Sequence, residues 1–74
     1  MTLILSNALV NTLHFHSIYM DDGDLILEGG GSIVTITGVP SDALAKIAVA
    51  TAEGKSYVEF ENAKLMIMEA EDDS

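Results

Sequence analysis

The pattern that comes nearest to a metal site is His14-Phe15-His16. Side chains two residues apart on a strand leave the same face, so the two imidazoles could approach one cation. Catalytic zinc needs a third protein ligand, and nothing in the sequence fixes the direction of the nearest carboxylates. We therefore predict neither a metal site nor a cofactor. His14 and His16 remain the only candidate ligands, and the alternative is two solvent-facing histidines on a half-exposed strand.

Two further segments share only some features of ligand-binding loops. The acidic segment 21–24, followed by Glu28, lacks the spacing and the flanking helices of a calcium-binding loop. We predict a solvated hairpin turn there. The segment Gly-Gly-Gly-Ser at 29–32 lacks the helix and the lysine that complete a phosphate-binding loop. A flexible hairpin loop is the prediction for it.

One pair of carboxylates has a spacing used in catalysis. Glu59 and Glu61 would lie about 7 Å apart on one face of a strand, which is within the range of glycoside hydrolases. A chain of 74 residues offers no deep cleft to remove them from water, and the alternative is a solvated polar face. Without cysteine, thiol catalysis, disulfides and cysteine-based zinc sites are excluded. The sequence predicts a protein that is not an enzyme.

The charge balance argues against direct binding of nucleic acid. Twelve acidic residues against three lysines and no arginine give a net charge of −9. Direct nucleic-acid binding requires a basic patch that neutralises phosphates, so it is not expected. An acidic surface attracts basic partner proteins, and it also keeps an apolar, self-associating protein soluble. Both interpretations stay open.

Hydropathy periods predict the elements that carry these residues. Strands are expected at 2–5, 8–20, 25–28 and 33–37, and residues 13–37 should form a three-stranded meander. The strand at 8–20 should bend or break near Asn11, and a short helix beginning at Ser6 is the alternative. The alternation within it places a set of apolar side chains on one face, namely Leu9, Leu13, Phe15 and Tyr19.

The second half of the chain changes period. A helix is predicted over residues 41–53, begun by Ser41 and ended by Gly54. Strands at 57–61 and 65–68 should follow as a C-terminal β-hairpin. The predicted fold is therefore a small α+β domain over residues 1–69, mostly antiparallel, with an acidic tail at 70–74. The helix is expected to bury a stripe of Leu44, Ile47, Ala48 and Thr51.

The helix has an unusually narrow polar side. On a helical projection, Asp42, Lys46 and Glu53 fall together, and nearly all other positions are apolar or small. A domain of this size without a disulfide is marginally stable alone, which favours association through a helix flank. The predicted oligomer interface comprises Ala45, Val49 and Ala52. High helix propensity of alanine is the alternative explanation.

The first functional hypothesis is a cytoplasmic, non-enzymatic protein-binding module that inhibits or adapts a larger protein, for example one that handles nucleic acids, as a homo-oligomer. No membrane association is expected, because the N-terminal segment lacks a cationic region and its apolar run is short. One alternative is a nucleotide-like small-molecule binder with sites at oligomer interfaces, and another is a structural assembly subunit. The predicted partner-binding residues are Asp21, Asp22, Asp24, Glu59, Glu61, Met66 and Met68.

Overall fold

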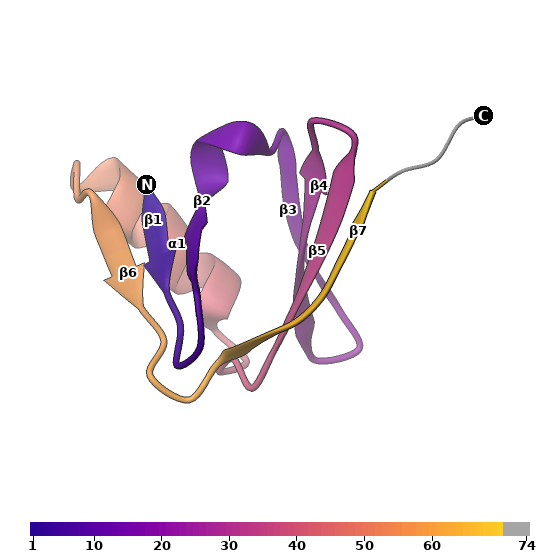
Figure 1. The fold of residues 1–74 in the computed structure, drawn as a ribbon. Helices are drawn as coiled ribbons and strands as arrows, with labels where there is room; N and C mark the ends of the chain where they lie inside the picture. Colours follow the sequence, from indigo (N-terminus) through magenta and orange to yellow (C-terminus); the bar gives the residue numbers. More distant parts are fainter. Residues whose placement is uncertain (71–74) are drawn as a thin grey trace.

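The chain folds into seven strands, one α-helix and one short 3-10 helix within the part that the structure describes (Figure 1). This computed structural model describes residues 1–70, and for residues 67–70 it describes only the backbone. The predicted α+β class is confirmed. The elements are β1 (Thr2–Ile4), β2 (Leu9–Asn11), η1 (Thr12–His14), β3 (Ser17–Asp21), β4 (Asp24–Gly29), β5 (Ser32–Thr37), α1 (Ala43–Ala52), β6 (Tyr57–Glu59) and β7 (Lys64–Ala70).

The strands form two sheets. The four-stranded sheet has the order β3-β4-β5-β7 and is entirely antiparallel. Its first three strands are the predicted meander. The β3–β4 turn consists of Asp22 and Gly23, whose φ angles of 52° and 84° are those that a two-residue hairpin turn requires. The predicted acidic tail lies beyond the described residues, except for Ala70, which ends β7.

The three-stranded sheet has the order β2-β1-β6, and it corrects the predicted C-terminal hairpin. Strand β6 pairs in parallel with β1, while β7 pairs with β5 in the other sheet. Phe60 and Ala63, in the connection between β6 and β7, are both buried in the core. The connection therefore crosses from one sheet to the other over the core, instead of turning back on β6. The side-chain amide of Asn7 fixes the start of β7, because it donates a hydrogen bond to the Leu65 carbonyl and accepts one from the Leu65 N–H.

The predicted strand at 8–20 is interrupted. Its first part is β2, its second part is β3, and η1 lies between them. The side chain of Asn11 accepts a hydrogen bond from the backbone N–H of Leu13 at 3.0 Å, which caps the turn of 3-10 helix. The expected break near Asn11 is therefore confirmed, but the single alternating face is not, because Leu13 leaves from η1 and is 80% exposed.

Helix α1 lies behind the three-stranded sheet in the view of Figure 1 and contacts both β6 and β3. It buries Ala43, Ile47 and Ala50, so the predicted stripe is correct at Ile47 but wrong at Leu44, Ala48 and Thr51. Alanine at the first and last of the buried positions lets the helix axis lie close to the core, and Leu44 is left 38% exposed. The helix ends as predicted at Gly54, which has a φ of 73°.

The core lies between the two sheets and under α1. Its largest fully buried side chains come from β1, β4 and β5. No described residue contributes a buried polar or charged side chain to it, so the interior provides packing and no chemistry. The buried cluster consists of Leu3, Leu5, Val10, Leu25, Leu27, Val34, Ile36, Ala43, Ile47, Phe60 and Ala63.

Candidate functional site

The predicted partner-binding carboxylates do not form one surface. Asp21, Asp22 and Asp24 surround the β3–β4 turn, whereas Glu59 ends β6 and Glu61 lies in the turn after it. These two segments lie on opposite sides of the molecule in Figure 1. A single acidic surface for a basic partner protein would need them together. The larger, nucleic-acid-handling partner therefore stays a prediction made from composition.

The predicted methionine face is altered by a β-bulge in β7. Thr35 pairs with Ile67 and Ile36 pairs with Leu65, so Met66 is an extra residue without a partner in β5. Its side chain is 60% exposed. Met68 pairs with Val34 in backbone register, and its side chain lies outside the part that the structure describes. A shared face for the two methionines stays a prediction.

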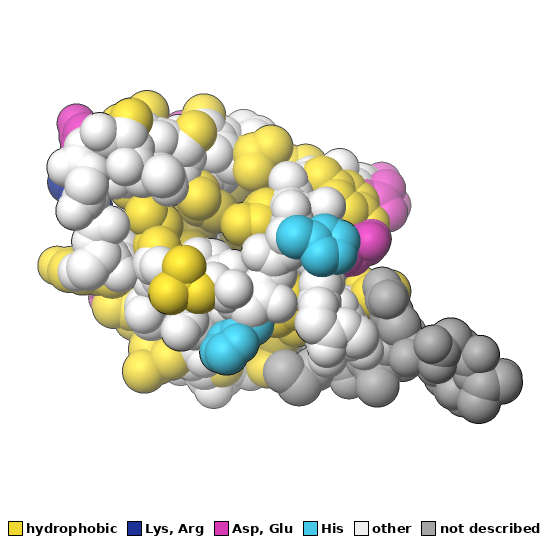
Figure 2. Space-filling view, turned by 90° about the horizontal axis from the view of Figure 1, so that it is seen from above, with side chains coloured by type: hydrophobic (Ala, Val, Ile, Leu, Met, Phe, Trp, Pro, Cys, Tyr) yellow, Lys and Arg dark blue, Asp and Glu magenta, His cyan; other side chains and the backbone are white. Residues whose placement is uncertain are grey.

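The two histidines are not arranged as strand neighbours. His14 ends η1 and His16 precedes β3, so the two-residue strand spacing behind the metal hypothesis does not apply. Figure 2, which views the molecule from above, shows the two imidazoles at separate places on the surface. The His16 Nδ1 lies 3.1 Å from the Ser17 hydroxyl. Among the residues that the structure describes, no three histidines, aspartates or glutamates come together as metal ligands.

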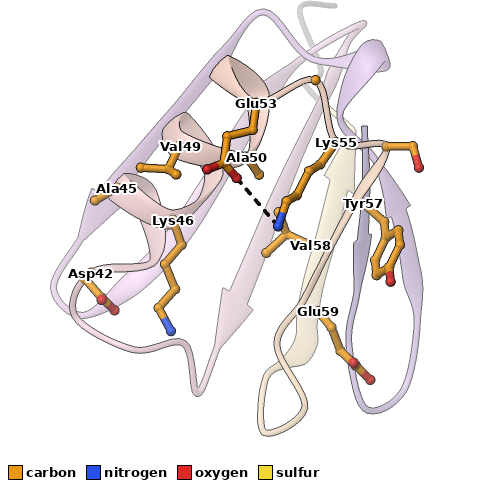
Figure 3. A pocket seen from close by; sticks show the side chains of 12 residues that line it. Asp42, Ala45, Lys46, Val49, Ala50, Glu53, Lys55, Tyr57, Val58 and Glu59 are labelled. Carbon is orange, nitrogen blue, oxygen red and sulfur yellow. Dashed lines mark ion pairs between the residues drawn. The ribbon is translucent and has the colours of Figure 1, made fainter.

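A groove of about 830 Å³ lies between α1 and β6 (Figure 3). We call it the α1–β6 groove. One wall is the exposed flank of the helix, and the other is the strand with the loop that leads into it. Its lining residues are Asp42, Ala45, Lys46, Val49, Ala50, Glu53, Gly54, Lys55, Ser56, Tyr57, Val58 and Glu59.

The floor of this groove and the middle of its helix wall are apolar. Ala45 and Val49, both predicted as interface residues, line it, and Val49 is 56% exposed. Val58 points from β6 towards the helix, while Tyr57 and Glu59 point away from it (Figure 3). Ala52, the third predicted interface residue, is exposed but does not line the groove. Two of the three predicted interface residues therefore line the groove, and their role in an oligomer interface stays a prediction.

Charged side chains border the apolar floor. Two of the three lysines of the chain, Lys46 and Lys55, line the groove. The Lys55 Nζ lies 3.6 Å from Glu53 Oε1, and both side chains are more than half exposed, so this ion pair contributes little to stability. Lys46 and Glu59 also line an adjoining hollow of about 360 Å³, which extends the groove towards Glu61.

The backbone of β6 presents a free edge to the groove. The Ser56 carbonyl accepts from Thr2 and the Phe60 N–H donates to Ile4, at 2.9 and 2.8 Å. Because bonding groups alternate along a strand, residues 56, 58 and 60 face β1, and Tyr57 and Glu59 face away. Within the described residues, the N–H and C=O groups of these two residues have no partner outside the strand ladder. We call these four groups the free edge of β6.

Sequence reasoning missed several residues of this site. The sequence places Lys46 on the narrow polar side of the helix, but it assigns no role to Lys55 or Tyr57. Their position depends on the parallel pairing of β1 with β6, which joins segments more than 50 residues apart. The available signal was the short run 57–59 after an apolar helix, since a parallel strand of the same sheet needs a crossover of this kind.

Comparisons with known proteins add no family to this description, because no family, curated protein or solved structure gives a significant match to the chain. Within the described residues, α1 is the one α-helix, and no helix is long and apolar enough to cross a bilayer.

Proposed function

We propose that this chain is a non-enzymatic protein-binding domain that receives an extended backbone segment in the α1–β6 groove, paired to the free edge of β6. The observation that supports the proposal is the position of an unpaired strand edge beside an apolar hollow. An unpaired edge is a template for another strand, and recognition by strand addition uses such an edge for affinity and adjacent pockets for specificity.

The groove provides both parts of this recognition. Tyr57 and Glu59 offer two N–H donors and two C=O acceptors to an incoming backbone. Every second side chain of that segment would point inwards, over Ala45, Val49 and Val58. The alternate side chains would point outwards beside Glu59 and Glu61, where a net charge of −9 favours basic groups.

The arrangement favours binding over catalysis. Tyr57, Glu59 and both groove lysines are exposed, so water remains in contact with every charged group in the hollow. General acid–base and electrostatic catalysis gain their strength from exclusion of water. An open groove with an apolar floor beside a free strand edge suits a backbone ligand.

A synthetic peptide of alternating valine and lysine, capped at both ends, tests the proposal. In amide spectra, this peptide should shift the resonances of Tyr57 and Glu59 and leave those of the β3–β4 turn unchanged. The control is a peptide of the same length and charge in which proline replaces each valine, because proline cannot donate a ladder hydrogen bond. Equal shifts with both peptides would show attraction by charge alone and would contradict strand addition.

A further inference from the structure

We infer that the segment received by the α1–β6 groove is β6 of a second copy of this chain, running antiparallel about Val58. Two three-stranded sheets would then join into one sheet of six strands. The inference rests on the proposed function, because it names the partner of the same groove. It also gives the predicted homo-oligomer a defined geometry.

The backbone groups that remain available determine the register. The N–H of Lys55 already donates to the Ala50 carbonyl at 2.9 Å, as part of the helix end. Within β6, Tyr57 and Glu59 are therefore the two residues that offer both a donor and an acceptor. In an antiparallel pair, residues that exchange both hydrogen bonds lie directly opposite each other. Placing Tyr57 opposite Glu59 of the second copy uses all four groups of each chain.

The two neighbouring symmetric registers are less favourable. With Tyr57 opposite its own copy, Glu59 would face Lys55, whose N–H is already bonded to the helix end. With Glu59 opposite its own copy, two carboxylates would face each other across the strands, which is destabilising. The two-fold axis is therefore expected beside Val58.

Charge complementarity supports the same register. Lys55 lies two residues before Tyr57, and Glu61 lies two residues after Glu59. The register consequently carries Lys55 of each copy towards Glu61 of the other, at both ends of the paired strands. Opposite charges across antiparallel strands are stabilising. In the centre, the Tyr57 phenol faces the Glu59 carboxylate of the second copy, and a phenol–carboxylate hydrogen bond of this kind already joins Tyr19 to Glu28 within one chain.

The helices complete the contact. A two-fold axis perpendicular to the joined sheet leaves both copies of α1 on the same face. The flanks formed by Ala45 and Val49 then face each other, and the small alanine side chains allow a close approach. The interface is closed and self-complementary, so no β6 edge is left over for further growth.

Charge reversal at Lys55 and Glu61 tests the inference by sedimentation velocity and native mass spectrometry. The unmodified chain should be a dimer of twice the 7.9 kDa chain mass. At physiological salt, where the net charge is screened, Lys55→Glu alone and Glu61→Lys alone each place like charges opposite one another at both ends. Each variant should then dimerise more weakly, by about threefold or more. An equimolar mixture restores opposite charges at both ends. It should form a mixed dimer, detected by isotope labelling of one variant.

The mixture separates this pairing from a general effect of charge, because the mixed pair has the same total charge as the unmodified pair. Lys64→Glu and Asp21→Lys change the charge equally at sites away from β6, and a mixture of these two should show no preference for mixed dimers. Dispersed amide spectra of each variant establish that it is folded. A monomeric unmodified chain at millimolar concentration, or the absence of mixed dimers, would overturn the inference.

A peptide experiment distinguishes failure of strand addition from failure of the second copy as its occupant. The alternating peptide is added to the Lys55→Glu chain at a concentration at which this variant is monomeric, so that the free edge of β6 is vacant. If the unmodified chain is monomeric but the peptide shifts Tyr57 and Glu59, strand addition stands and the second copy is wrong as its occupant. If the mixed dimer forms but the peptide has no effect, the edge is a dimer contact and receives no other strand.

Discussion

At the scale of single residues, the exposed face of the four-stranded sheet holds one polar contact with a measurable consequence. The Tyr19 hydroxyl donates to the Glu28 carboxylate on the neighbouring strand. This hydrogen bond, together with the nearby negative charges of Glu28 and Asp21, raises the pKa of Tyr19 above its ordinary value of 10.0. The neutral phenol is favoured because it can donate, whereas a phenolate would face a carboxylate.

The raised pKa predicts a loss of stability only at alkaline pH. A group whose pKa is higher in the folded chain contributes its stabilisation below the unfolded value, and loses it as pH rises through the folded value. In a Tyr57→Phe background, phenolate absorbance reports Tyr19 alone, and its midpoint should lie above 10.0. Adding Glu28→Ala should lower that midpoint. An unchanged midpoint would show that Glu28 does not hold the phenol.

Gly29 is a second residue with a sharp prediction. Its φ is +150°, and a Cβ atom there would lie 2.7 Å from the His16 backbone nitrogen and 2.8 Å from the Phe15 Cα. Gly29→Ala should destabilise the fold by about 2 kcal/mol or more, because overpacking and the strained φ add. Gly23→Ala is the control, since its φ is +84° but nothing lies within 4 Å. Urea unfolding measures both, and equal losses would refute the close approach.

At the scale of elements, the sequence predicts the features that depend on residues close together along the chain. The Asp-Gly turn, the meander and the glycine end of α1 follow from turn and capping chemistry and are confirmed. The partner of β6 could not be predicted in this way, because nothing local distinguishes return to β7 from parallel pairing with β1. The candidate site depends on that pairing, so only its helix wall, at Ala45 and Val49, was predictable.

The buried face of α1 differs from the predicted one, and this changes which side chain of the helix contributes most to stability. Ile47 is 7% exposed and Leu44 is 38% exposed. Ile47→Ala should therefore lower the free energy of unfolding by about 2–5 kcal/mol. Leu44→Ala should cost less, because part of its side chain already contacts water. Chemical denaturation of both variants decides this, and a larger loss at Leu44 would place the helix in the orientation expected from the sequence.

The groove flank of α1 has its own prediction. Ala45 and Ala48 are both exposed on the helix, but only Ala45 lines the α1–β6 groove. Ala45→Glu should weaken self-association at least tenfold, since it places a charge between apolar surfaces. Ala48→Glu adds the same charge to the same helix and should leave association nearly unchanged. Analytical ultracentrifugation compares them, and equal weakening would indicate that charge, not the groove, controls association.

At the scale of the whole molecule, a net charge of −9 opposes the meeting of two copies. Exposed ion pairs such as Lys55 with Glu61 contribute only about 0.2–1 kcal/mol each, so overall repulsion outweighs them at low ionic strength. The Debye length shortens to about 8–10 Å near physiological salt. The apolar flanks and the backbone hydrogen bonds of β6 then determine whether the copies stay together.

Two dependences follow from this balance. Salt raised from low to physiological concentration should strengthen dimerisation, because it screens repulsion more than it weakens two ion pairs. The melting temperature should also rise with protein concentration, since association stabilises the folded chain by mass action. Differential scanning calorimetry at several concentrations and salt levels measures both. Dimerisation that weakens with salt would show that ion pairs, not strand pairing, hold the copies together.

The most direct test of the β6 edge is hydrogen exchange of individual amides at high and low protein concentration. The Phe60 N–H, bonded to Ile4 within the chain at 2.8 Å, serves as the internal reference and should be protected at both concentrations. The Tyr57 and Glu59 N–H groups should be protected at high concentration, where a second strand covers the free edge, and should exchange rapidly on dilution. Rapid exchange of Tyr57 and Glu59 at every concentration, in a sample whose Phe60 remains protected, would contradict strand pairing at β6.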